Sequence, residues 1–277
     1  MPPSDLDRLL TEQRNPASEA IDNLPTEAML RIISDEDHKV APAVAVEIPR
    51  IAKAVDAIAA RLDAGGRLFY VGAGTSGRLG VLDASEIPPT FHLEPGRVVG
   101  VIAGGEMALA RSTEASEDDE NAGARDLAAH KVTAADAVAG LSASGRTPYV
   151  LGAVRSARVA GALTIGISCT PDSALSAAVE IAIAPLVGPE IIAGSTRLKA
   201  GTATKLVLNM LSTGAMIRLG YVYGNLMINV RPANEKLAVR ARRIIVQVAG
   251  VDYHRAAALL EAAGGNVRDA IRMAKHG

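Results

Sequence analysis

Two segments of the 277-residue chain combine glycines with hydroxyl side chains, and each comes directly after a run of apolar residues. Residues 72–78 read Gly-Ala-Gly-Thr-Ser-Gly-Arg, and residues 142–147 read Ser-Ala-Ser-Gly-Arg-Thr. Glycine lets a backbone approach an anion closely, hydroxyls donate hydrogen bonds, and the first turn of a following helix offers free N–H groups. Because no lysine or carboxylate cluster accompanies them, the two loops predict a site for a small phosphate monoester. The residues that we expect to bind it are Gly74, Thr75, Ser76, Ser142, Ser144 and Thr147.

Two other interpretations of these loops remain open. Residues 72–77 also match the G-x-G-x-x-G pattern of dinucleotide sites, but Glu94, at the spacing of the required acidic residue, lies before the next strand begins. The hydroxyl residues could instead be ordinary helix N-caps in two unrelated turns. Capping alone does not require both loops to contain Ser-Gly-Arg, so we favour the phosphate site.

The elements that must position the loops alternate between strands and helices. Apolar, β-rich runs occupy residues 67–72, 98–103, 136–141, 162–168 and 179–184, with helical patterns between them. This alternation predicts an α/β fold in which a doubly wound, five-stranded parallel sheet is flanked by helices. Since the carboxyl ends of parallel strands lie at one edge of a sheet, both hydroxyl loops are expected to meet at that edge.

The sequence predicts three parts. Residues 1–64 are expected to form an N-terminal arm and helices that pack on the core, residues 65–232 the sheet domain, and residues 233–277 a small C-terminal helical region. In the sheet domain, the hydroxyl-rich segment 188–202 is expected to open a further helix that closes over the same ligand. Its candidate ligand-binding residues are Ser195 and Lys199.

Three local patterns give sharper expectations for individual helices. A short helix from Thr26 is expected to end before a solvated turn at 34–37. Apolar residues at alternating spacings of four and three make one helical face from 40 to 62, with candidate breaks at its prolines. The helix after the first loop, from residue 79, is expected to end before Pro88 and Pro89.

The composition excludes several classes of function. A formal net charge of -1 argues against nucleic acid or an anionic membrane as the main partner. Cys169 is the only cysteine, so no intrachain disulfide is expected. The first residues lack the basic-then-apolar pattern of a signal peptide, and no run of 18 apolar residues occurs. The five histidines show no metal-ligand spacing, so no metal is expected. These features favour a cytoplasmic protein.

Longer motifs add a family resemblance. Residues 71–80, 82–86, 143–149, 194–202 and 234–237 resemble motifs of the sugar isomerase (SIS) domain, which binds sugar phosphates. More narrowly, the chain resembles the N-acetylmuramic acid 6-phosphate etherase family from about residue 11 to its end. The glucokinase regulatory proteins share these motifs, so the same fold can also bind a sugar phosphate without catalysis.

The resemblance implies a cofactor-free carbon–oxygen lyase of amino-sugar recycling. Such an enzyme cleaves the ether between C3 of the sugar and D-lactate and releases N-acetylglucosamine 6-phosphate. Loss of the C2 proton, which is α to the aldehyde of the open-chain sugar, and protonation of the ether oxygen expel lactate; water then adds at C3. Two proton-transferring groups suffice for these steps. Matched residue by residue, Glu86 is the acid at the C3 oxygen and Glu117 the base at C2.

Two alternatives from other classes remain open: a non-catalytic sugar-phosphate sensor, and an aldose–ketose isomerase, which needs a base at C2 but no acid at C3. The presence of both Glu86 and Glu117 argues against the sensor. If residues 76–86 form one straight helix, Glu86 lies about 15 Å from Ser76 along its axis. Either the chain then folds back, or Glu86 serves the site of a second subunit. The extended apolar face of residues 44–62 also favours a homodimer.

Overall fold

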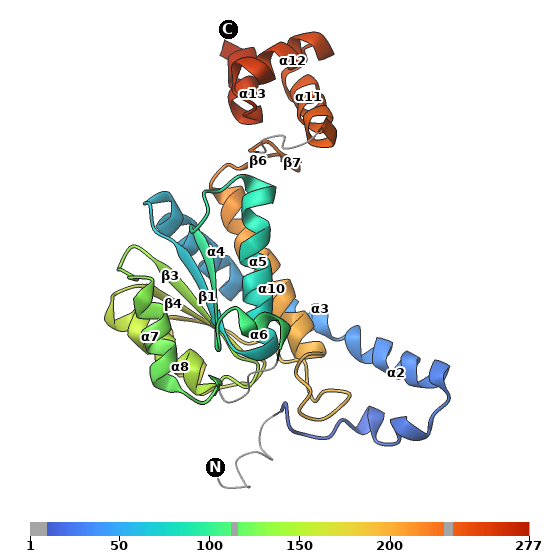
Figure 1. The fold of residues 1–277 in the computed structure, drawn as a ribbon. Coiled ribbons are helices and arrows are strands. Elements are labelled where there is room, and N and C mark those ends of the chain that lie inside the picture. Colours follow the sequence, from blue (N-terminus) through green and yellow to red (C-terminus); the bar gives the residue numbers. More distant parts are fainter. Residues whose placement is uncertain (1–9, 112–115, 230–234, 277) are drawn as a thin grey trace.

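The computed structural model describes residues 10–111, 116–229 and 235–276 of the chain (Figure 1). Its centre is a five-stranded, all-parallel sheet with the strand order β2-β1-β3-β4-β5. The strands are β1 (Leu68–Gly72), β2 (Val98–Ile102), β3 (Ala137–Leu141), β4 (Leu163–Ile167) and β5 (Ile181–Ile183). The predicted α/β fold with five parallel strands is therefore confirmed.

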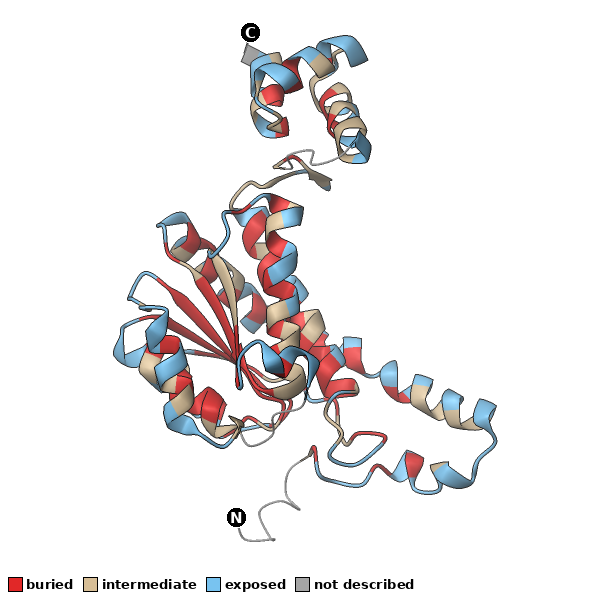
Figure 2. Cartoon of the chain, viewed as in Figure 1, coloured by how far each residue is buried: buried red, intermediate tan, exposed pale blue. Residues whose placement is uncertain are grey.

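Helices cover both faces of the sheet (Figure 1). One face packs against α4 (Ile48–Asp63), α5 (Gly74–Phe91) and α10 (Lys199–Arg218), and the other against α7 (Glu120–Ala129), α8 (Pro148–Val159) and the short α9 (Ala174–Ala178). Because side chains alternate along a strand, Leu68 and Tyr70 enter the first layer whereas Phe69 and Val71 enter the second. The three central strands, β1, β3 and β4, are buried along their whole length (Figure 2).

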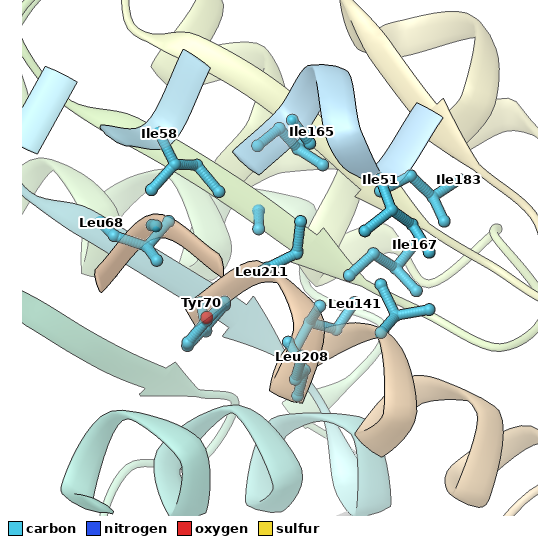
Figure 3. Close-up of a cluster of buried hydrophobic side chains, with 14 of the residues drawn as sticks. Ile51, Ile58, Leu68, Tyr70, Leu141, Ile165, Ile167, Ile183, Leu208 and Leu211 are labelled. Carbon is cyan, nitrogen blue, oxygen red and sulfur yellow. The ribbon is translucent and has the colours of Figure 1, made fainter. Parts of the chain in front are cut away.

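The first layer is an aliphatic core between the sheet, α4 and α10 (Figure 3). Its centre contains the fully buried Ile58, Leu208 and Leu211, which pack toward the strand residues Ile165 and Tyr70. A chain without tryptophan fills this space with branched aliphatic side chains and alanine. The core holds α10 and α4 against the strands whose ends carry the candidate site.

Helix α5 continues past the point at which the sequence predicted its end. It runs through Pro88 and Pro89 to Phe91, and His92 ends it in the left-handed conformation with a φ of 49°. Each proline removes one N–H from the last turns, but Ile87 and Phe91 are buried against the core and hold those turns in place. Glu86 therefore lies within a continuous helix.

The N-terminal part differs from the prediction in its first helix, and the helical face that follows is interrupted near one of its prolines (Figure 1). Helix α2 (Thr26–Asp37) includes the expected turn at 34–37, because Glu36 is buried and ion-paired rather than solvated. The predicted helical face at 40–62 is divided between α3 (Val40–Val46) and α4, with the break at Glu47. Pro49 in the first turn of α4 is tolerated there because the N–H that it lacks would have no helical partner.

The C-terminal helices have a core of their own. Strands β6 (Val222–Tyr223) and β7 (Leu226–Met227) form a two-stranded sheet that precedes these helices. The helices are α11 (Glu235–Ala249), α12 (Tyr253–Ala262) and α13 (Val267–His276). They pack around Ile245, Leu259 and Ile271. The predicted pair of short helices around Gly264 and Gly265 is confirmed. Across the described residues, no helix combines the length and the apolar character that crossing a membrane requires.

Candidate active site

The first hydroxyl loop joins β1 to α5. Gly74 starts the helix with a φ of 51°, which favours glycine. A Cβ on Gly77 would lie 2.7 Å from the carbonyl oxygen of Gly72, so that glycine lets the first turn of α5 pack against the strand. Thr75 and Ser76 are partly exposed. Ala73, the N-cap residue, makes no side-chain capping bond, so the first turn faces the loop surface without a capping hydroxyl.

The second hydroxyl loop joins β3 to α8 and forms a hydroxyl cluster. Ser142 Oγ lies 2.8 Å from Thr147 Oγ1 and 3.4 Å from Ser144 Oγ. Ser144 Oγ accepts a hydrogen bond from the Arg146 N–H at 3.3 Å. Thr147 is the N-cap residue of α8 but forms no capping bond. Simple N-capping therefore does not explain the hydroxyls at the start of either helix.

Glu117 connects the two loops. A Cβ on Gly74 would lie 2.9 Å from Glu117 Oε1, so the carboxylate lies directly over the backbone of the first loop. The Glu117 carbonyl oxygen accepts a hydrogen bond from the Tyr149 N–H at 3.0 Å, at the start of the helix that follows the second loop. The side chain is half-buried. A proton-accepting group thus lies between the two loops.

The other carboxylates near Glu117 have different positions. Asp119 is the N-cap of α7 and accepts a hydrogen bond from the Ala122 N–H at 2.9 Å. Glu120 pairs with Arg155, and Asp118 is exposed. Glu117 therefore lies in the segment before α7, three residues ahead of its first residue. Glu114, and Asn234 of the C-terminal motif, lie outside the described residues.

Glu86 lies away from both loops of its own chain. It is exposed on α5, and ten residues of unbroken helix place it about 15 Å from Ser76 along the axis. The alternative in which the chain folds back is excluded by the continuity of α5. One turn earlier, Asp83 is buried and accepts a hydrogen bond from Lys205 Nζ at 2.8 Å.

The start of α10 adjoins the first loop, but a buried carboxylate occupies its N-terminus. Glu190 accepts hydrogen bonds from the N–H groups of Lys199 at 3.0 Å and Ala200 at 2.9 Å. Lys199 is 1% exposed, and its Nζ lies 2.5 Å from Glu36 Oε2. Ser195 is half-buried in the preceding loop, and its N–H donates to the Ile192 carbonyl. The structure does not bring Lys199 together with the hydroxyl cluster.

Thr75 of the first loop lies against the first turn of this helix. A Cβ on Gly201 would lie 3.5 Å from Thr75 Cγ2. Sequence reasoning missed Glu190 and Glu36, the two buried carboxylates of this region. A signal for Glu36 was present, since it continues the helical spacing of the apolar residues Met29 and Ile33. Nothing comparable marks Glu190.

A cavity of about 840 Å³ lies between the edge strand β2 and α7 rather than over the loops. Its polar lining includes Ser116, Asp119 and Asp126, and Asp126 accepts a hydrogen bond from the Tyr149 hydroxyl at 2.7 Å. Burial, and then this hydrogen bond, raise the pKa of Tyr149. Within residues 10–111, 116–229 and 235–276, no three His, Cys, Asp or Glu side chains form a group that could hold a metal ion.

The fold is similar to that of known proteins. Residues 50–158 match the family model of the glucokinase regulatory protein N-terminal SIS domain. An Escherichia coli CFT073 protein, solved as a complex with a ligand, has a TM-score of 0.51 and 17% sequence identity, over 73% of this chain and 97% of that chain. At that identity the solved structure supports the fold alone.

Two curated relatives are far more similar in sequence. The N-acetylmuramic acid 6-phosphate etherase of Symbiobacterium thermophilum is 58% identical over 267 residues, which cover 96% of this chain and 89% of the relative. The protein of the same name from Serratia proteamaculans is 55% identical over 268 residues, covering 97% of this chain and 90% of the relative. With this identity over nearly its whole length, the chain belongs to the N-acetylmuramic acid 6-phosphate etherase family.

Proposed function

We propose that this chain cleaves the C3 lactyl ether of N-acetylmuramic acid 6-phosphate to N-acetylglucosamine 6-phosphate and D-lactate, in the recycling of cell-wall amino sugars. The observation that carries the proposal is the carboxylate of Glu117, which lies over Gly74 of a phosphate-type loop. A base at this position can reach a carbon of a sugar whose phosphate is bound by the loop. Membership of the etherase family supports the same reaction.

The reaction consists of an elimination followed by a hydration. Glu117 takes the C2 proton of the open-chain sugar, the bond between C3 and the ether oxygen breaks, and Glu86 gives its proton to the departing lactate oxygen. Water then adds across the double bond, with its hydroxyl going to C3 and a proton returning to C2. Glu86 removes the proton from the water and Glu117 returns one to carbon, so both groups end as they began.

The hydroxyl loops bind the 6-phosphate in this proposal. Thr75 and Ser76 lie at the first loop, and the cluster of Ser142, Ser144 and Thr147 lies at the second. The uncapped first turn of α5 adds N–H donors and the positive end of the helix dipole.

The predicted contacts of Ser195 and Lys199 belong to the same proposal, with one requirement. Ser195 is half-buried in the loop before α10. It precedes Gly201, which packs against Thr75, by six residues, so we expect it to approach a ligand bound above Thr75. Lys199 would have to leave Glu36 before its ammonium could reach that ligand.

A homodimer completes each site in this proposal. Because α5 is continuous, Glu86 reaches the loops of a second subunit rather than its own. Leu82, one turn before Glu86, is 46% exposed on the same helix, which suits a face that another subunit covers. We assign residues 1–64 to the arm and packing helices, 65–232 to the SIS domain and 233–277 to the C-terminal helical region, and we place the protein in the cytoplasm.

The test is incubation of the purified chain with N-acetylmuramic acid 6-phosphate in ¹⁸O-labelled water. The proposal predicts release of D-lactate and one labelled oxygen at C3 of the product sugar. Binding of the substrate without lactate release would favour the sensor. An isomerised sugar that keeps its lactyl group would favour the aldose–ketose isomerase.

A further inference from the structure

An ion pair between α5 and α10 has one buried end and one accessible end. Lys205 Nζ on α10 lies 2.8 Å from Asp83 Oδ1 on α5. The side chain of Asp83 is 4% exposed, whereas that of Lys205 is 30% exposed. The carboxylate is thus fixed in the helix interface, and it holds an ammonium that solvent or a ligand can reach.

The surroundings of Asp83 leave Lys205 as the cation that pairs with it. The second carboxylate oxygen of Asp83 and the hydroxyl of Tyr70 are both buried without a hydrogen-bond partner among the described residues. Burial, and then the negative charge of Asp83, raise the pKa of Tyr70, which therefore stays neutral. Lys205 is left to balance the charge of Asp83, and a buried carboxylate without such a cation would be strongly unfavourable.

This ammonium lies next to the proposed acid. Asp83 and Glu86 are three residues apart on α5, a spacing that puts their Cβ atoms about 5–6 Å apart on the same side of a helix. Lys205 therefore extends from α10 toward the turn of α5 that carries Glu86. An ammonium has three N–H donors, and Asp83 Oδ1 takes one of them.

The other basic side chains of these two helices are engaged elsewhere. Arg78 donates to the carbonyl oxygens of Leu109 at 3.2 Å and Arg111 at 3.0 Å. Lys199 pairs with Glu36, and Arg218, at the far end of α10, pairs with Asp56. Of the four basic residues on α5 and α10, Lys205 is the one that lies near Glu86 and keeps N–H donors beyond the one that Asp83 accepts.

We propose that Lys205 binds the carboxylate of the lactyl group, an inference that rests on the proposed etherase function. The lactyl carboxylate is attached to the carbon that bears the ether oxygen, so it must lie close to the acid that protonates this oxygen. A fixed ammonium beside Glu86 meets that carboxylate with a charge-assisted hydrogen bond. Lys205 is then a specificity-determining residue, because the product sugar has no carboxylate for it to bind.

The test compares two variants that differ only in this ion pair. Both carry Glu117→Gln, to slow turnover; one of them also carries Lys205→Met together with Asp83→Asn, so that no buried carboxylate is left alone. Calorimetry gives the Kd of N-acetylmuramic acid 6-phosphate and of N-acetylglucosamine 6-phosphate for each. Loss of Lys205 is expected to weaken the binding of N-acetylmuramic acid 6-phosphate about 10- to 100-fold, the range for a hydrogen bond to a charged group. The Kd of N-acetylglucosamine 6-phosphate should stay unchanged.

If the binding of both sugars weakens equally, or if the binding of neither weakens, the inference is overturned and Lys205 has a structural role. Lys205→Arg alone keeps the charge and should keep the preference for the lactyl sugar, which provides a second readout if the triple variant does not fold. Failure of the proposed function is distinguishable, because the unaltered chain would then release no lactate at all.

Discussion

Lys199 at the start of α10 and Glu36 near the end of α2 form a buried ion pair, with 2.5 Å between Nζ and Oε2. The two side chains are 1% and 4% exposed. Glu36 also pairs with Lys39, and the neighbouring N-terminal segment is attached to the loop before α10 by hydrogen bonds from Asn15 to the Pro189 carbonyl and from Ser18 to the Ile191 carbonyl. The pair therefore fixes the N-terminal part to the helix that borders the candidate site.

Replacing Glu36 by glutamine should destabilise the protein strongly. The change leaves the Lys199 ammonium buried without a counter-charge, and removal of one partner of a buried pair costs about 3–5 kcal/mol. Urea unfolding followed by circular dichroism measures the free energy. Glu27→Gln is the matched control, since its pair with Arg31 is 78% and 75% exposed and should contribute little. Equal stability of the two variants would contradict a structural role for the buried pair.

The same pair should make stability depend on pH in the acid range. Burial alone would raise the pKa of Glu36, but hydrogen bonds from Lys199, Lys39 and Asn15 outweigh it and lower the pKa from 4.5 to about 2. A carboxyl whose pKa is lowered on folding adds stability above its ordinary pKa and loses it as the pH falls toward the folded value. The difference in unfolding free energy between the unaltered chain and Glu36→Gln should therefore shrink between pH 5 and pH 3. A constant difference would show that Glu36 does not have the lowered pKa.

The sequence predicts the sheet well because its central strands are buried on both faces. Continuous apolar runs such as 136–141 and 162–168 end at hydroxyl or glycine residues, so the local pattern locates β3 and β4 to within a residue or so at each end. The same local pattern locates the two hydroxyl loops, because they begin where the apolar runs of β1 and β3 end.

Features that depend on contacts between residues far apart in the sequence cannot be predicted from a local pattern. The turn expected at 34–37 is helical because Glu36 meets Lys199, 163 residues later in the chain. Asp83 and Lys205 are 122 residues apart. The contact of Glu117 with Gly74 likewise exists only after the sheet has formed. The continuation of α5 past its two prolines depends on the burial of Phe91, a tertiary effect.

Removing one hydroxyl of the second loop should weaken phosphate binding. Ser144→Ala deletes a neutral donor to a charged group, a loss of about 1.5–3 kcal/mol in binding free energy. Calorimetry with N-acetylglucosamine 6-phosphate measures the effect, and Ser156→Ala on α8 is a control outside the loop. Unchanged affinity in Ser144→Ala would remove Ser144 from the phosphate site.

The two glutamates should differ in the partial reaction that each supports. Glu117→Gln should lose exchange of the C2 hydrogen with deuterated solvent, because no base remains at C2. Glu86→Gln should retain exchange, since deprotonation α to the aldehyde can precede lactate departure. Each change should slow turnover at least about 100-fold, the lower end for a positioned acid or base. NMR of the recovered sugar reads the exchange, and the opposite pattern would reverse the two roles.

The central claim is that each site joins Glu117 and the hydroxyl loops of one subunit to Glu86 of another. It is tested by mixing Glu86→Gln and Glu117→Gln proteins, each inactive alone, under conditions in which subunits exchange. In a mixed dimer, one site would have both natural glutamates and the other neither. Random pairing of equal amounts should therefore restore about one quarter of the lactate-releasing activity of the unaltered protein, if the dimer is symmetric. Mixed dimers that release no lactate would contradict a site shared between subunits.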